Sequence, residues 1–191
     1  MKSVAHNLTI RVFFISATFL LGTLALKAQD TLDNSHEQHY WLNGGVGVCS
    51  GSIPLSLGAI LSYQTGTKLI SIRYVYNTEF LRILGPEPDE RIQDFGALYG
   101  IILKKTTKSL VSISGGISFV SVVRRGKPIY DGFRISEYEK LIYQTVGVAL
   151  HGQFFWTPLS FFGLGVDIPV SLNKERSFIA VQYSLQVGIL R

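Results

Sequence analysis

Residues 53–63 read IPLSLGAILSY, and apolar residues alternate there with small or polar ones. Successive side chains of a β-strand point to opposite faces, so one face of this stretch carries only apolar side chains. The opposite face has no charged residue, whereas a strand facing bulk water usually carries several. The pattern therefore favours a strand that turns its apolar face to lipid and its small, polar face to the crowded interior of a barrel. The residues on the apolar face are Ile53, Leu55, Leu57, Ala59, Leu61 and Tyr63.

The same alternation recurs to the end of the chain. Each segment is close to the ~9–11 residues that a tilted strand needs to cross a bilayer. We therefore predict an all-β fold, an antiparallel up-and-down transmembrane β-barrel of about eight strands. In one segment the alternation places Lys104 on the inner face. The eight segments are 41–50, 53–63, 70–77, 95–104, 111–119, 142–153, 162–170 and 179–190.

The N-terminus predicts export. Residues 1–28 combine basic Lys2 and Arg11 with an apolar run, and Ala28 offers a small residue for cleavage. We interpret 1–28 as a cleaved secretory signal peptide, 29–40 as a flexible polar lead-in and 41–191 as one barrel domain. The alternative for the apolar run is an uncleaved anchor, which its short length disfavours.

Charge and cysteine content exclude other classes. The chain has 18 Lys and Arg against 13 Asp and Glu, and the predicted signal removes three basic residues and no acidic one. The mature chain would then carry a net charge of only +2, which gives no case for nucleic-acid binding. The single Cys49 excludes an internal disulfide, and we expect a buried, inert thiol.

The predicted connections differ in length on the two sides of the barrel. Those after the second, fourth and sixth segments are short, and those after the third and fifth are long. With its exported N-terminus and its terminal strand, the chain resembles a small, porin-like outer-membrane β-barrel of the OmpA/OmpX type from Gram-negative bacteria. The resemblance implies a place in the cell outer membrane, contact with its lipid, and handling by the secretion and barrel-assembly machinery. Such barrels usually end in an aromatic residue that this machinery reads, whereas this chain ends in Ile189, Leu190 and Arg191.

Three ionisable residues fall on the predicted inner face, namely Arg73, His151 and Asp167. We expect an ion pair between Arg73 and Asp167 with His151 nearby, because charges in a low-dielectric interior need partners. In this interpretation the cluster fills the lumen and is structural. The alternative makes His151 a general base oriented by Asp167, which requires a serine within hydrogen-bond reach.

Two further motifs lie outside the predicted strands. Arg124, Arg125 and Lys127 fall in the longest predicted loop, where they would meet lipopolysaccharide phosphates or water. In residues 36–39 two histidines are three positions apart, which does not match the metalloprotease spacing, so we expect a solvated segment. No motif indicates a metal, a cofactor or a catalytic residue.

These observations predict a non-enzymatic outer-membrane barrel with a structural or envelope-interaction role through its outer loops. Two alternatives stay open. One is a barrel-borne lipid hydrolase or acyltransferase. The other is a secreted, lipocalin-like binder with its apolar face inside.

Overall fold

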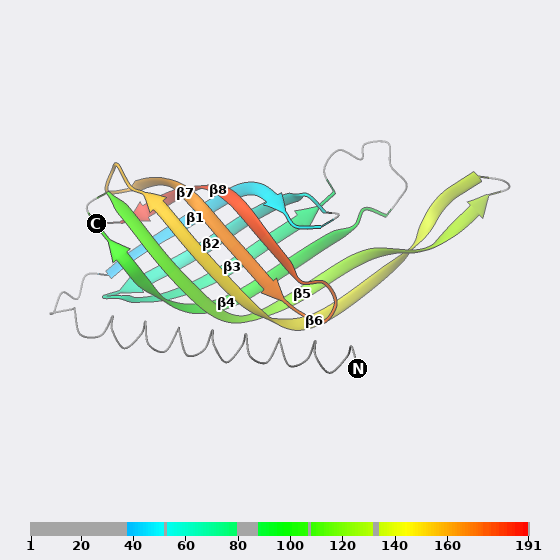
Figure 1. Cartoon of the computed structure of the whole chain (residues 1–191), viewed down its shortest axis with the longest axis horizontal. Coiled ribbons are helices and arrows are strands. Elements are labelled where there is room, and N and C mark those ends of the chain that lie inside the picture. The colour runs from blue at the N-terminus through cyan, green and yellow to red at the C-terminus, as the bar shows by residue number, and fades with distance from the viewer. Residues whose placement is uncertain (1–37, 52, 80–87, 107, 132–133, 191) are drawn as a thin grey trace, which may run out of the picture. The chain divides into compact units, whose positions relative to one another are not determined.

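A computed structural model describes residues 38–51, 53–79, 88–106, 108–131 and 134–190. All eight predicted segments form strands, which pair in chain order into one closed, antiparallel barrel, with β8 pairing back to β1 (Figure 1). In the described part of the chain, no helix is long and apolar enough to cross a membrane. The strands are β1 (Gln38–Cys49), β2 (Leu55–Thr65), β3 (Lys68–Thr78), β4 (Arg91–Lys105), β5 (Ser109–Asp131), β6 (Arg134–Trp156), β7 (Phe162–Leu172) and β8 (Phe178–Ile189).

The predicted facing of the strands is confirmed, apart from Ile53 and Lys104. In β2, Leu57, Leu61 and Tyr63 are exposed on the outside, and Ser56 and Ser62 are buried in the lumen. In β8 every second residue, from Ile179 to Ile189, is likewise an exposed apolar or aromatic side chain. The outer surface is thus apolar and the lumen largely polar, as in a barrel whose surroundings are lipid.

The connections define two different rims. The short-turn rim holds residues 66–67, residues 106 and 108 between β4 and β5, and residues 157–161, together with the start of β1 and the end of β8. Gly66 has φ +58°, the left-handed conformation that a two-residue hairpin turn requires. The opposite, loop-side rim holds the described residues 50–51, 53–54, 79, 88–90 and 173–177 and the base of the β5–β6 hairpin.

The longest predicted loop is instead a continuous hairpin, which corrects the expectation of a loop at 124–140. β5 and β6 have 23 residues each and pair as far as Asp131 and Arg134. Their neighbours stop earlier, because β4 pairs with β5 only to Val123 and β7 pairs with β6 only to Val148. The two strands therefore leave the barrel wall as a two-stranded arm (Figure 1).

Other predicted positions also need correction. β1 begins at Gln38, so 38–40 belong to the barrel and not to a lead-in, and His39 is buried, not solvated. Ile53 precedes β2 and is buried at the loop-side end of the lumen. A register shift between Ile102 and Lys104 turns Lys104 outward. The predicted signal peptide 1–28 and residues 29–37, with His36 and Glu37, lie outside the described residues.

Side chains fill the lumen from one rim to the other. Each end is closed by a buried apolar cluster, and a third, smaller one lies between them beside polar side chains. The backbone is also tightly curved, since a side chain at Gly47 would collide with the carbonyl of Val181 on the neighbouring strand. An eight-stranded barrel is narrow enough for side chains to occupy its whole interior. The two end clusters are Cys49, Ile53, Val75, Ile92, Val120, Val122, Phe178 and Ala180 at the loop side, and Trp41, Leu69, Ile102, Leu110, Phe155 and Leu190 at the short-turn side.

Because Leu61 and Leu103 face outward, the cost of a charge at either position should depend strongly on its depth in the bilayer. Leu61→Arg puts a charge on the lipid face near the middle of β2 and should lower the unfolding free energy by about 2–4 kcal/mol. Leu103→Arg, beside exposed Lys104 at the short-turn rim, should cost about 0–1 kcal/mol. Urea unfolding of the barrel in phosphatidylcholine vesicles measures both, and equal losses would contradict the assigned depth.

Candidate functional site

Four buried ionisable residues of the lumen form a group that we call the lumen cluster, namely Arg73, Asp94, His151 and Asp167. Arg73 extends from β3 across the lumen. Its guanidinium donates to a carboxylate oxygen of Asp94 at 2.9 Å and to the backbone carbonyl of Leu150 at 2.8 Å. Weaker bonds reach the carbonyl of Val170 at 3.3 and 3.4 Å. One side chain therefore connects β3, β4, β6 and β7.

The expected Arg73–Asp167 pair is wrong, and strand geometry explains why. Arg73 is paired in register with Gly96 on β4, which makes Asp94 its diagonal neighbour on the same face. That carboxylate lies on the adjacent strand, whereas Asp167 lies across the lumen. The sequence held a signal for Asp94, because extending the alternation of Phe95 and Gly96 back by one residue places Asp94 on the inner face.

The sequence also explains why the backbone carbonyl of Val170 can accept bonds from Arg73. Pro169 has no N–H to donate, and the ladder between β7 and β8 is interrupted between Asp167 and Val170. The Val170 carbonyl stands beside that break, where it accepts bonds from Arg73.

His151 and Asp167 form the second pair of the cluster. Nε2 of His151 lies 3.2 Å from a carboxylate oxygen of Asp167. Arg73, His151 and Asp167 all line one internal cavity of about 10 Å³, which is the space of about one water molecule. The three predicted residues are thus brought together, although their pairing differs from the one expected.

Among the described residues, the one hydrogen-bond partner of the His151 ring is Asp167. Nδ1 of His151 has no hydrogen-bond partner among the described residues. The nearby hydroxyl of Ser114 donates to the backbone carbonyl of His151 at 3.5 Å and not to its ring. Within the described ranges, no group of three His, Cys, Asp or Glu residues is placed to hold a metal ion.

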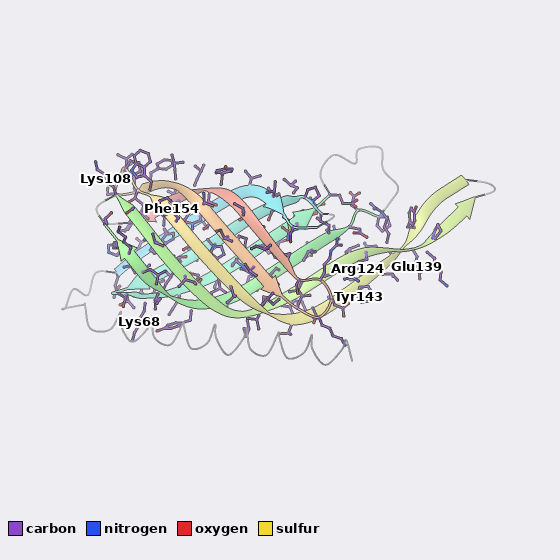
Figure 2. The ribbon with its side chains drawn as sticks, viewed as in Figure 1. Lys68, Lys108, Arg124, Glu139, Tyr143 and Phe154 are labelled. Carbon is purple, nitrogen blue, oxygen red and sulfur yellow. The ribbon has the colours of Figure 1, made fainter. Side chains whose placement is uncertain are left out.

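At the loop-side rim, the base of the β5–β6 hairpin is fastened by basic residues. Arg125 makes a two-pronged ion pair with Glu79, at 3.1 and 2.5 Å. Arg124 donates to the backbone carbonyl of Glu175 and lies over the ring of Tyr143, 5.8 Å from its centre (Figure 2). Both arginines, predicted as loop residues, are therefore strand residues with internal partners, and Lys127 is exposed farther along the arm.

Glu90 joins three parts of this rim. It accepts a bond of 2.9 Å from Arg176 in the 173–177 connection and one of 3.5 Å from the backbone N–H of Arg125. Partial burial alone would raise the pKa of Glu90, but the bonds and charges of Arg176 and Arg125 outweigh it. The pKa of Glu90 therefore lies below its ordinary value of 4.5, and the ion pair is fully formed at neutral pH.

Comparisons with known proteins show which solved structures have a similar fold. No protein-family model matches the chain. No curated protein matches it either. Among solved structures, it is similar to the N-terminal β-barrel domain of Pseudomonas aeruginosa OprF, with a TM-score of 0.55 at 8% identity over 78% of this chain and 96% of that one. It also resembles Neisserial surface protein A, with a TM-score of 0.54 at 9% identity over 81% and 97%. A third similar structure is Ail, the attachment invasion locus protein of Yersinia pestis, with a TM-score of 0.51 at 10% identity over 81% and 98%.

The class of protein follows from the closed barrel, its apolar outside and these likenesses. The chain has the fold of a small, eight-stranded outer-membrane β-barrel. Within that class its architecture is of the OmpA/OmpX type, as the sequence resemblance implied. At identities of 8–10% the likeness defines the fold, and the role has to be argued from this chain's own surfaces.

The Arg73–Asp94 pair can be tested with a double-mutant cycle. Arg73→Met and Asp94→Asn should each lower the unfolding free energy by about 3–5 kcal/mol, because each leaves a buried charged partner. The double variant should recover part of that loss. Arg73→Met with Asp167→Asn is the matched control, expected to be closer to additive because these two side chains have different partners. Strict additivity for Arg73 and Asp94 would contradict the assigned pair.

The lowered pKa of Glu90 predicts how the hairpin responds to acid. Its contribution to rim stability is fully present above its ordinary pKa of 4.5 and is lost as the pH falls through its lowered value in the folded protein. A spin label at Lys127→Cys should therefore report constant mobility from pH 7 to 5 and higher mobility in stronger acid. In Glu90→Gln the label should already be more mobile at pH 7 and respond less to pH. Identical titration curves for the two proteins would exclude this role of Glu90.

Proposed function

We propose that this protein is a non-enzymatic integral protein of the outer membrane that contacts the cell envelope through its β5–β6 hairpin. The observation that carries the proposal is the length of this hairpin. β5 and β6 have 23 residues each, whereas the other six strands have 11 to 15. The closed lumen leaves the outer surfaces as the places where the protein meets other molecules.

The hairpin is suited to act beyond the membrane. The eight residues of β5 past Val123 extend about 26 Å at the ordinary rise of a strand. In bacterial outer-membrane barrels the short turns face the periplasm and the long connections face outward. With that orientation the arm would stand among the sugars and phosphates of lipopolysaccharide.

Charge on the arm supports lipopolysaccharide as its partner. Arg124 and Arg125 are bonded to other residues of the protein. The direct contact with lipopolysaccharide would therefore be made by Lys127 and Lys140. Lys140 is paired in register with Arg125. Both lysines are exposed. Arg124 and Arg125 then hold the arm, while lysine ammonium groups meet phosphates.

The two alternative functions fit less well. A lipocalin-like binder needs an interior cavity, whereas the lumen is occupied by side chains and its described cavity is about 10 Å³. A lipid hydrolase needs a nucleophile beside His151, and the serine nearest in the register, Ser114, contacts its backbone. The lumen cluster is better explained as a structural group that connects strands across the barrel.

Binding to lipopolysaccharide tests the hairpin directly. Lys127→Gln/Lys140→Gln should weaken binding of the detergent-folded protein to lipopolysaccharide micelles several-fold, because two exposed charges are lost. Lys174→Gln removes an exposed charge from the same rim but not from the arm, and should change binding little. Heat-dependent gel mobility verifies that each variant is folded. Unchanged binding of the double variant would reject the hairpin as the lipopolysaccharide contact.

A further inference from the structure

The described residues of the short-turn rim carry positive charge only. Three exposed lysines lie there, at the first residue of β3, at the last but one residue of β4 and in the connection that follows β4. Among the described residues of this rim there is no Asp or Glu. We call these three residues, Lys68, Lys104 and Lys108, the basic arc.

The basic arc spans neighbouring strands. β3 pairs with β4, β4 pairs with β5, and Lys68 stands in register with Ile101, three residues before Lys104. Figure 2 shows Lys68 and Lys108 separated along the end of the barrel opposite the hairpin. Charges spread along a rim suit many small anionic groups better than one compact ligand.

Aromatic side chains mark the depth of this rim. Tyr40, Tyr63, Trp156 and Phe161 are exposed within a few residues of the strand ends. Aromatic residues of membrane barrels gather at the level of the lipid headgroups. The ammonium groups of the arc therefore lie where lipid phosphates lie, and long lysine side chains reach that layer from the barrel wall.

The loop-side rim provides the contrast. There the basic residues alternate with acidic ones, and ion pairs neutralise Arg125 with Glu79 and Arg176 with Glu90. The mature charge of the chain is small, but it is divided unequally between the two rims. An excess of positive charge at one rim, beside an apolar belt, attracts anionic lipid.

We propose that the basic arc binds the phosphates of anionic phospholipids, of the phosphatidylglycerol kind, in the periplasmic leaflet of the outer membrane. The arc would fix the height of the barrel in the bilayer and enrich these lipids around β3, β4 and β5. The inference rests on the membrane location proposed above and is independent of the hairpin's role.

The test uses the full-length protein folded into phosphatidylcholine vesicles that contain a trace of spin-labelled lipid. Labelled phosphatidylglycerol should associate with the wild-type barrel more strongly than labelled phosphatidylcholine. In Lys68→Gln/Lys104→Gln/Lys108→Gln this ratio should fall by roughly twofold or more, and added salt should reduce it in the wild type. Lys127→Gln/Lys140→Gln/Lys174→Gln removes the same charge from the opposite rim and should leave the ratio unchanged.

Each outcome is decisive. A barrel that folds but shows no preference, or that loses it equally in both triple variants, overturns the lipid proposal. An unchanged ratio with weaker retention of the arc variant by purified sacculi also overturns it and assigns the arc to the cell wall. If the triple variant does not fold, the single charge reversal Lys108→Glu, outside any strand, should still lower the ratio. A wild-type protein that does not insert at all would instead refute the membrane location.

Discussion

A bilayer offers no hydrogen bonds to an exposed backbone, and this constraint shapes the whole molecule. Each strand has to find both of its partners within the chain, so β8 closes onto β1. Closure with only eight strands leaves a narrow interior that side chains fill. The polar face of every strand is therefore buried among other strands, and its charges have to be paired inside the wall.

The lumen cluster meets that requirement by using both neighbouring and distant strands. Arg73 is paired with Asp94 on the adjacent strand and reaches backbone carbonyls across the lumen. Apolar clusters close both ends, so the charges lie in a low dielectric where an unpaired group is costly. His151 and Asp167 are buried inside the same closed lumen.

The two rims differ in how they handle charge. At the loop side, arginines and glutamates neutralise one another and hold the base of the hairpin. At the short-turn side, lysines are exposed to whatever surrounds the barrel. This difference between the rims is not visible in the net charge of +5.

The sequence by itself determined the strands, their number and their facing, because a period-two pattern is written locally and one face had to be apolar. It also placed Arg73, His151 and Asp167 in the lumen. Tertiary structure decided what local pattern does not encode. The register between strands made Asp94 the partner of Arg73, and continued pairing of β5 with β6 turned a predicted loop into an arm. A register shift moved Lys104 from the inner face to the lipid-facing rim. Pairing between strands is a long-range property, so it is fixed only when the barrel closes.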